Sequence, residues 1–235
     1  MPVTAAWLQD NALYLLLALG TIFNIFWLFN FQDRLKMKWW AVLLISVLHT
    51  VYGVLTVMLF AFAESGFNPD SLGNMSIFGG VFLMPIAYFL GAKLFKRKPG
   101  EVFDIFLICM MFTLMCARIN CIISGCCKGC LIFGSETARW PTRELEVVFY
   151  IVLLIIFGRR VKRNESRGEL YPAYMFLYGI FRFITEFFRV SERSAGIFHL
   201  SHLWALISFG LGVSLYYELK SKNKKTRRYT TCLKE

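Results

Sequence analysis

The sequence predicts an all-α, polytopic membrane protein with seven transmembrane helices, its N-terminus outside and its C-terminus in the cytoplasm. Three observations support this fold class. The chain is 57% hydrophobic and only 17% charged, a composition typical of membrane proteins. Its apolar segments are long enough to cross a bilayer, and its basic residues are concentrated in alternate loops. We expect one seven-helix membrane domain over residues 1–235.

Four uncharged runs each have the length that a helix needs to span about 30 Å of hydrocarbon. They cover residues 11–32, 39–63, 71–92 and 194–217. Three further apolar segments contain charged residues and cover about 103–123, 144–158 and 170–190. All seven segments are needed to keep the basic loops in alternation, which supports the count.

Most of the 26 lysines and arginines lie near residues 34–38, 93–98 and 159–167 and in the segment 220–235. The positive-inside rule places these loops in the cytoplasm. Residues 124–143 then form a short extracytoplasmic, cysteine-rich loop, and residues 220–235 form a basic cytoplasmic tail near anionic lipids. Because this distribution accounts for the net charge of +11, we expect no nucleic-acid partner.

Two arginines, Arg118 and Arg182, lie inside predicted membrane helices. A cation at bilayer depth costs about 3 kcal/mol even on lenient scales, and arginine does not lose its proton. Counting 1.5 Å per residue from the cytoplasmic ends places both in the outer half of the bilayer. We therefore predict that the two guanidinium groups bind one phosphate of an outer-leaflet lipid by forked hydrogen bonds.

Arg182 belongs to a stripe on one helical face that also contains Tyr178, Glu186 and Arg189. Two interpretations remain open for this stripe: a structural ladder of ion pairs, or part of an anion site. Arg118 has no acidic residue four positions away on its own helix, which favours the anion site.

Cys126, Cys127 and Cys130 face outwards in this topology, where disulfides form. Gly129 suits a tight turn among them. A zinc site is the weaker interpretation, because it needs a fourth ligand and no histidine lies nearby in the sequence. We therefore expect no metal and no other cofactor.

The charged residues resemble the signatures of the prolipoprotein diacylglyceryl transferase family. Its last motif, Tyr-Gly-x-x-Arg-Phe-x-x-Glu-Phe-x-Arg, is matched in full from Tyr178 to Arg189. A Gly-Arg-Ile-Gly-Asn-type run matches at Arg118, and the glycine that ends it falls on Gly129. A His-Pro-Ser-Gln-Leu-Tyr-Glu-type segment matches at its proline and at Glu146. The chain looks like a compact, divergent branch with a Gly-Cys-Cys signature.

The resemblance implies transfer of a diacylglyceryl group from phosphatidylglycerol to the lipobox cysteine thiol of prolipoproteins. The reaction belongs to the outer leaflet of the bacterial cytoplasmic (inner) membrane. The implied partners are phosphatidylglycerol, the prolipoprotein signal peptide with its lipobox cysteine, and membrane lipids. The implied catalytic residues are Arg118, Arg182, Glu146 and Glu186. The implied phospholipid-binding residues are Arg118, Arg182, Tyr178, Gly129, Arg189 and the pair Gly79 and Gly80.

Three departures from the family pattern bear on the reaction. Phe78 stands where the family has a histidine that is regarded as catalytic, Cys121 replaces the signature asparagine, and Cys126 replaces an acid. His49, in the middle of the second predicted helix, is a possible replacement base, although such a residue more often only hydrogen-bonds a neighbour. Two alternatives stay open: a related transferase with a hydroxyl or small-molecule acceptor, and a non-catalytic lipid-binding protein.

Overall fold

The structure, a computed structural model, describes residues 5–132, 135–166, 168–190 and 199–232. These residues form α-helices joined by loops, with one 3-10 turn, η1, at Pro69–Ser71. Among them, β structure is limited to two isolated bridges. The helices are α1 (Ala5–Asn30), α2 (Gln32–Leu35), α3 (Trp39–Glu64), α4 (Ile77–Leu94), α5 (Pro99–Ile123), α6 (Thr142–Lys162), α7 (Leu170–Glu186) and α8 (Leu200–Cys232).

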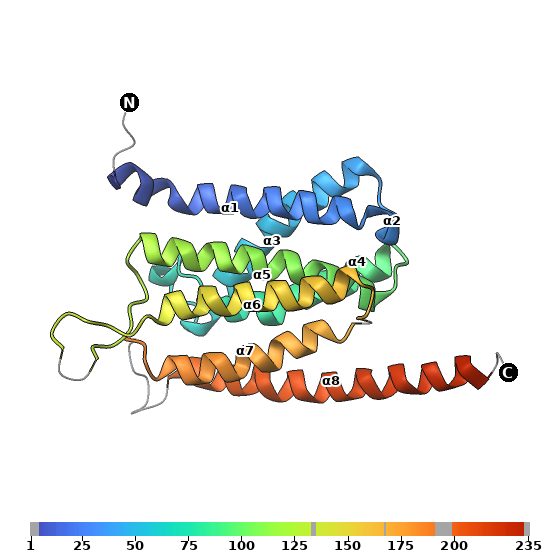
Figure 1. The fold of residues 1–235 in the computed structure, drawn as a ribbon. Coiled ribbons are helices and arrows are strands. Elements are labelled where there is room, and N and C mark those ends of the chain that lie inside the picture. Colours follow the sequence, from blue (N-terminus) through green and yellow to red (C-terminus); the bar gives the residue numbers. More distant parts are fainter. Residues whose placement is uncertain (1–4, 133–134, 167, 191–198, 233–235) are drawn as a thin grey trace.

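The long helices lie lengthwise beside one another in a single bundle (Figure 1). Helix α5 is the central element, because it contacts α1, α4, α6 and α7, while α8 packs mainly on α7. The N-terminus and the loop between α5 and α6 lie at one end of the bundle. Helix α2 and the C-terminus lie at the opposite end, which is also the end that holds the basic loops.

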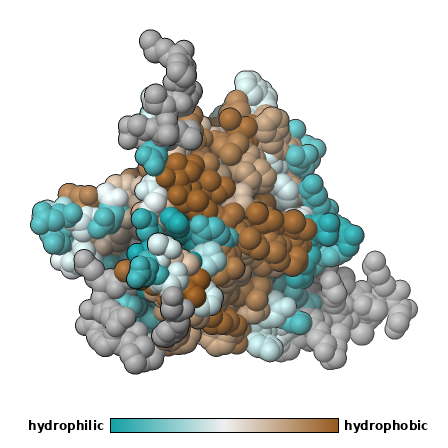
Figure 2. All heavy atoms as spheres, turned by 60° about the vertical axis from the view of Figure 1, so that its left-hand side comes forward, coloured by the Kyte–Doolittle hydropathy of each residue, from teal (hydrophilic) through white to brown (hydrophobic). Residues whose placement is uncertain are grey.

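Five of the helices are long and apolar enough to cross a membrane: α1, α3, α4, α5 and α8. Helix α7 has only 17 residues, and α6 has charged residues near both ends. Many large hydrophobic side chains on the flank of the bundle are exposed, as lipid contact requires, and Figure 2 shows them as wide hydrophobic areas. The helical architecture and the five long apolar helices therefore confirm the predicted all-α, polytopic membrane fold.

Each of the seven predicted segments contains one long helix, but several boundaries were wrong. Helix α4 begins at Ile77 rather than at residue 71, and α7 ends at Glu186 rather than at residue 190. Residues 194–198, predicted to begin the last helix, lie outside the described residues. Helix α8 continues to Cys232, so the predicted tail from residue 220 is helical over most of its length.

Close helix contacts position the charged residues of α7. A Cβ atom on Gly179 would lie 2.7 Å from the Ala205 carbonyl oxygen and from the Phe209 nitrogen of α8, so only glycine allows this approach. At the other end of α7, the buried Asp104 carboxylate of α5 accepts hydrogen bonds from the Gly168 N–H at 2.7 Å and the Leu170 N–H at 3.2 Å. These contacts hold α7 in register beside α5 and α8.

Candidate active site

Five charged side chains from three consecutive long helices meet in the bundle near the end that carries the loop between α5 and α6. They are Arg118 of α5, Glu146 of α6, Arg182 and Glu186 of α7, and Arg189 just after α7. We call this group the arginine–glutamate cluster. Arg118, Glu146, Arg182 and Glu186 are all at most 7% exposed. Water therefore solvates their charges little, and the opposite charges of the cluster must compensate one another.

Two carboxylates link the three guanidinium groups. Glu146 Oε2 lies 2.9 Å from Arg118 Nε and 3.9 Å from Arg182 Nη1. Glu186 Oε2 lies 2.7 Å from Arg182 Nη2 and 3.6 Å from Arg189 Nη1. Arg118 Nε is not aligned as a hydrogen-bond donor, so its short contact with Glu146 is an ion pair only. The absence of an acid four positions from Arg118 was therefore misleading, because its acidic partner comes from another helix.

The cluster has an unbalanced positive charge. Three arginines face two glutamates, which leaves one net positive charge within the cluster, and the half-buried Glu64 at the end of α3 lies within electrostatic range of Arg182 and Glu186. In addition, Nε and Nη1 of Arg182 are buried and have no hydrogen-bond partner among the described residues. Burial, followed by the positive charges of Arg182 and Arg118, lowers the pKa of Arg189. An anion bound here would satisfy the free donors and relieve this repulsion. The stripe therefore contains the ion pairs of the ladder, and the anion site stays a prediction.

Tyr178 is fully buried, and its hydroxyl donates to Glu146 Oε1 at 3.5 Å. This contact orients the carboxylate that Arg118 and Arg182 share, and the role of Tyr178 in binding lipid stays a prediction. The ring of Phe78 packs edge-on against the Tyr178 ring, with centroids 5.8 Å apart. Phe78 is thus next to the cluster but offers no group that accepts a proton.

The loop after α5 is tied to the end of α7 by backbone contacts. Gly129 forms an antiparallel bridge with Arg189, and a Cβ atom at Gly129 would collide with the Trp140 carbonyl oxygen. Arg143 Nη1 donates to the carbonyl oxygens of Cys121 at 3.1 Å and of Cys126 at 3.2 Å. Gly129 therefore holds the loop against the cluster through its backbone.

Three thiols form a compact group beside the cluster. The sulfur atoms of Cys121, Cys126 and Cys127 all lie within 4.8 Å of one another, and Arg118 Nη1 donates to Cys121 Sγ at 3.8 Å. Cys126, Cys127 and Cys130, for which disulfides were one possibility, are all free thiols, and Cys130 lies outside the group. A hydrogen bond from Cys121 and the positive charges of Arg189 and Arg118 lower the pKa of Cys127.

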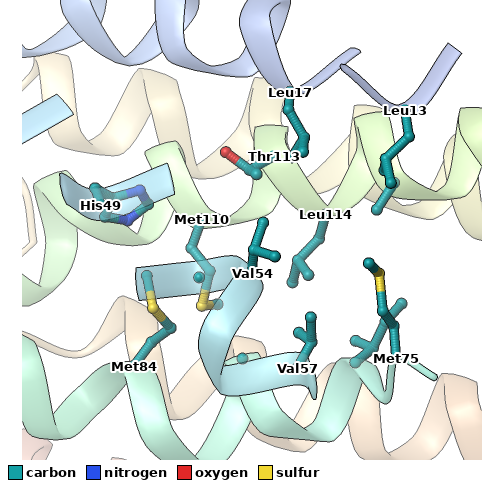
Figure 3. A pocket seen from close by; sticks show the side chains of 14 residues that line it. Leu13, Leu17, His49, Val54, Val57, Met75, Met84, Met110, Thr113 and Leu114 are labelled. Carbon is teal, nitrogen blue, oxygen red and sulfur yellow. The ribbon is translucent and has the colours of Figure 1, made fainter. Parts of the chain in front are cut away.

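The two glycines of α4 have different surroundings. A Cβ atom at Gly79 would collide with the Thr56 carbonyl of α3, so this residue allows close helix packing. Gly80 lines an apolar pocket of about 70 Å³ between α1, α3, α4 and α5. Leu114 and Ala117 also line the pocket, which therefore reaches the helix turn that carries Arg118 (Figure 3).

His49 lies at the other end of this pocket, as Figure 3 shows. Its Nε2 is 2.9 Å from the Tyr88 hydroxyl and its Nδ1 is 3.4 Å from Asn24 Nδ2. Its ring also packs on Phe106 of α5, with centroids 5.8 Å apart. Arg118 is 12 residues further along α5, about 18 Å away at 1.5 Å per residue. The structure therefore does not bring His49 together with the arginines.

Comparison with known proteins identifies the family. The model of the prolipoprotein diacylglyceryl transferase family matches residues 15–217. A phosphatidylglycerol–prolipoprotein diacylglyceryl transferase of Dehalococcoides mccartyi is 22% identical over 240 residues, which cover 92% of each chain. The enzyme of that name from Campylobacter curvus is 27% identical over 191 residues, 72% of this chain and 69% of its own. One from Mannheimia succiniciproducens is 30% identical over 136 residues, 54% of this chain and 51% of its own. This chain belongs to the prolipoprotein diacylglyceryl transferase family.

Proposed function

We propose that this protein transfers a diacylglyceryl group from phosphatidylglycerol to the lipobox cysteine thiol of a prolipoprotein. The observation that carries the proposal is the excess positive charge of the arginine–glutamate cluster, together with the two free donor atoms of Arg182. Family membership supports the same activity, because the relatives are named for this reaction.

In the proposed reaction, the thiolate sulfur attacks the glyceryl carbon that bears the phosphate. The C–O bond to the phosphate breaks, and its electron pair stays with the phosphate oxygen. The phosphodiester has one negative charge and the departing glycerol phosphate has two, so negative charge grows on the leaving group. Arg118 and Arg182 are placed to stabilise that growth in a site with little water, where preorganised cations supply several kcal/mol. Glu146 and Glu186 fix the positions of the two guanidinium groups.

We place the reaction at the outer leaflet of the bacterial cytoplasmic membrane. In this topology all seven long helices span the bilayer, with the N-terminus and the loop at residues 124–143 outside and the residues from 220 inside. The basic loops at the opposite end of the bundle support this orientation. Helix α6 packs on α5 and turns an exposed apolar face outwards, as lipid contact requires, while α7 packs on α5 and α8. The apolar pocket beside Arg118 would take part of a lipid acyl chain.

The test uses the purified full-length protein in detergent with phosphatidylglycerol labelled in its acyl chains and a peptide that contains a lipobox cysteine. We expect a thioether-linked, labelled peptide and one glycerol phosphate per transfer. The matched control is the same peptide with serine in place of cysteine, which should remain unlabelled. Labelling of the serine peptide or of glycerol would show a hydroxyl acceptor. Bound labelled lipid with no release of glycerol phosphate in the presence of any acceptor would show that the cluster binds lipid without catalysis.

A further inference from the structure

The thiols of Cys121, Cys126 and Cys127 form a site that the cluster chemistry described above does not use. Cys121 lies in the last turn of α5, and the other two follow the turn at Gly125, whose φ is 71°. Their three sulfur atoms converge within 4.8 Å of one another. Sulfur ligands of tetrahedral zinc, each about 2.3 Å from the ion, lie about 3.8 Å apart. The three sulfurs thus need to close by about 1 Å at most to hold one zinc ion.

The backbone at this site is held in an unfavourable conformation. Cys127 has a φ of 54°, in the left-handed region that residues other than glycine rarely adopt. Arg143 fixes the two flanking carbonyls, those of Cys121 and Cys126. Such strain persists where the surrounding structure imposes it, commonly at functional sites. In this conformation the Cys127 sulfur lies within 4.8 Å of the other two sulfur atoms.

The electrostatic surroundings suit a metal–thiolate centre. Three thiolates and one Zn²⁺ have a net charge of −1, and the adjacent arginine–glutamate cluster has a net charge of +1. Arg118 links the two groups directly, because it pairs with Glu146 and donates to Cys121 Sγ. The guanidinium of Arg118 would therefore stabilise the negative charge of the zinc–thiolate centre, while Nε and Nη1 of Arg182 remain available to phosphate.

We propose that Cys121, Cys126 and Cys127 bind one zinc ion whose fourth coordination position takes the acceptor thiol. Zinc sites with three protein ligands keep an open position for substrate, and a coordinated thiol is deprotonated. A structural zinc site needs a fourth protein ligand, whereas a site that leaves its fourth position to substrate does not. This inference rests on the proposed function, since it supplies the nucleophile for the same transfer.

The zinc site answers a chemical need that the cluster leaves open. Phe78 and Tyr178 offer no base, and His49 lies elsewhere. Glu146 and Glu186 are held by arginines, so among the described residues the half-buried Glu64 at the end of α3 is the remaining acid near the cluster. On binding zinc, the acceptor thiol gives its proton to water. Its sulfur then attacks the glyceryl carbon and glycerol phosphate departs, as above. The product sulfur is a neutral thioether, a much weaker zinc ligand, so the product leaves and the zinc ion remains. No oxidant or reductant is needed.

Metal binding is tested without turnover. The full-length protein, purified in detergent under reducing conditions and stripped with a chelator, is titrated with Zn²⁺ and with Co²⁺. We expect one ion per chain and the visible absorption of tetrahedral cobalt–thiolate. Cys126→Ser and Cys127→Ser should each weaken zinc binding by at least about tenfold. Cys130→Ser, in the same loop but outside the thiol group, is the matched control and should bind as the unaltered protein does.

Adding the lipobox peptide to the cobalt form should change its spectrum, and the serine peptide should not. Binding of no metal by the folded protein, binding unaffected by Cys126→Ser and Cys127→Ser, or a disulfide joining two of the three cysteines in the purified protein would overturn the proposal. So would full transfer activity in the metal-free protein. If cobalt binds and its spectrum responds to the peptide but no lipid is transferred, the proposed function fails while the metal–thiol site stands.

Discussion

Arg118 on α5 and Glu146 on α6 form an ion pair of 2.9 Å, and the same carboxylate oxygen lies 3.9 Å from Arg182 on α7. One carboxylate thus sets the spacing of two guanidinium groups that belong to different helices. Because Tyr178 donates to the other oxygen of Glu146, the carboxylate cannot rotate without losing a contact. The geometry of any bound phosphate depends on this residue.

Glu146→Gln keeps the size of the side chain but removes the charge that the two arginines share. We expect turnover to fall by about 100-fold or more, because Arg118 and Arg182 lose their fixed positions. The KM for phosphatidylglycerol should not rise, since the net charge of the cluster increases from +1 to +2. Steady-state kinetics over a range of lipid concentrations checks both parts. Unchanged turnover would contradict the role given to Glu146.

Arg182→Lys keeps the positive charge. A single ammonium group, however, cannot contact Glu146 and Glu186 and also offer two parallel N–H donors to a phosphate. We expect kcat/KM to fall by about 100- to 1,000-fold while the protein still folds. Arg163→Lys is the matched control, because Arg163 makes only an exposed ion pair with Glu165 at 3.8 Å. Equal activity of the Arg182 and Arg163 variants would argue against a forked phosphate contact.

Gly179→Ala tests the contact between α7 and α8. The added methyl group would lie 2.7 Å from backbone atoms of α8, so the helices must separate, at a cost of about 1–3 kcal/mol. Gly210→Ala in α8 has nothing within 4 Å of its added methyl and should be neutral or slightly stabilising. Thermal unfolding of the two variants in the same detergent measures the difference. A Tm for Gly179→Ala at or above that of Gly210→Ala would contradict the packing argument.

Phe78→His restores the histidine of the family pattern beside Tyr178. The position is 2% exposed, so a polar ring there should destabilise the fold by about 1–3 kcal/mol. We expect no gain in transfer by the zinc-loaded protein, because a zinc-bound thiol has already lost its proton. The measurement is the transfer rate with and without zinc. A severalfold faster zinc-loaded variant would show that deprotonation of the acceptor had been limiting.

The helices were predictable because their lengths and loop charges follow from the bilayer itself. The limits of α7 and α8 were not, because they depend on contacts that the sequence does not display. Helix α7 stops at Glu186, where the backbone turns to bridge Arg189 with Gly129. Helix α8 continues through a lysine-rich segment that hydropathy alone excludes from the membrane. Lysine and glutamate have helix propensities close to that of leucine, so a helix need not end where the hydropathy falls.

The charged residues of the candidate site were predictable from the cost of burying an arginine. Their pairing was not, because Glu146 is 28 residues from Arg118 and only the contact of α5 with α6 brings them together. The thiol group was missed for a related reason. Proximity in the sequence grouped Cys130 with Cys126 and Cys127. In the structure Cys121 takes that place, because the chain turns at Gly125.

The backbone bridge between Gly129 and Arg189 has a mechanical consequence. Arg189 contacts the loop through its main chain and Glu186 through its side chain, so a force applied to one is transmitted to the other. If a bound peptide displaced the loop, Arg189 would therefore pass the displacement to Glu186 and from there to Arg182, which pairs with the same carboxylate oxygen.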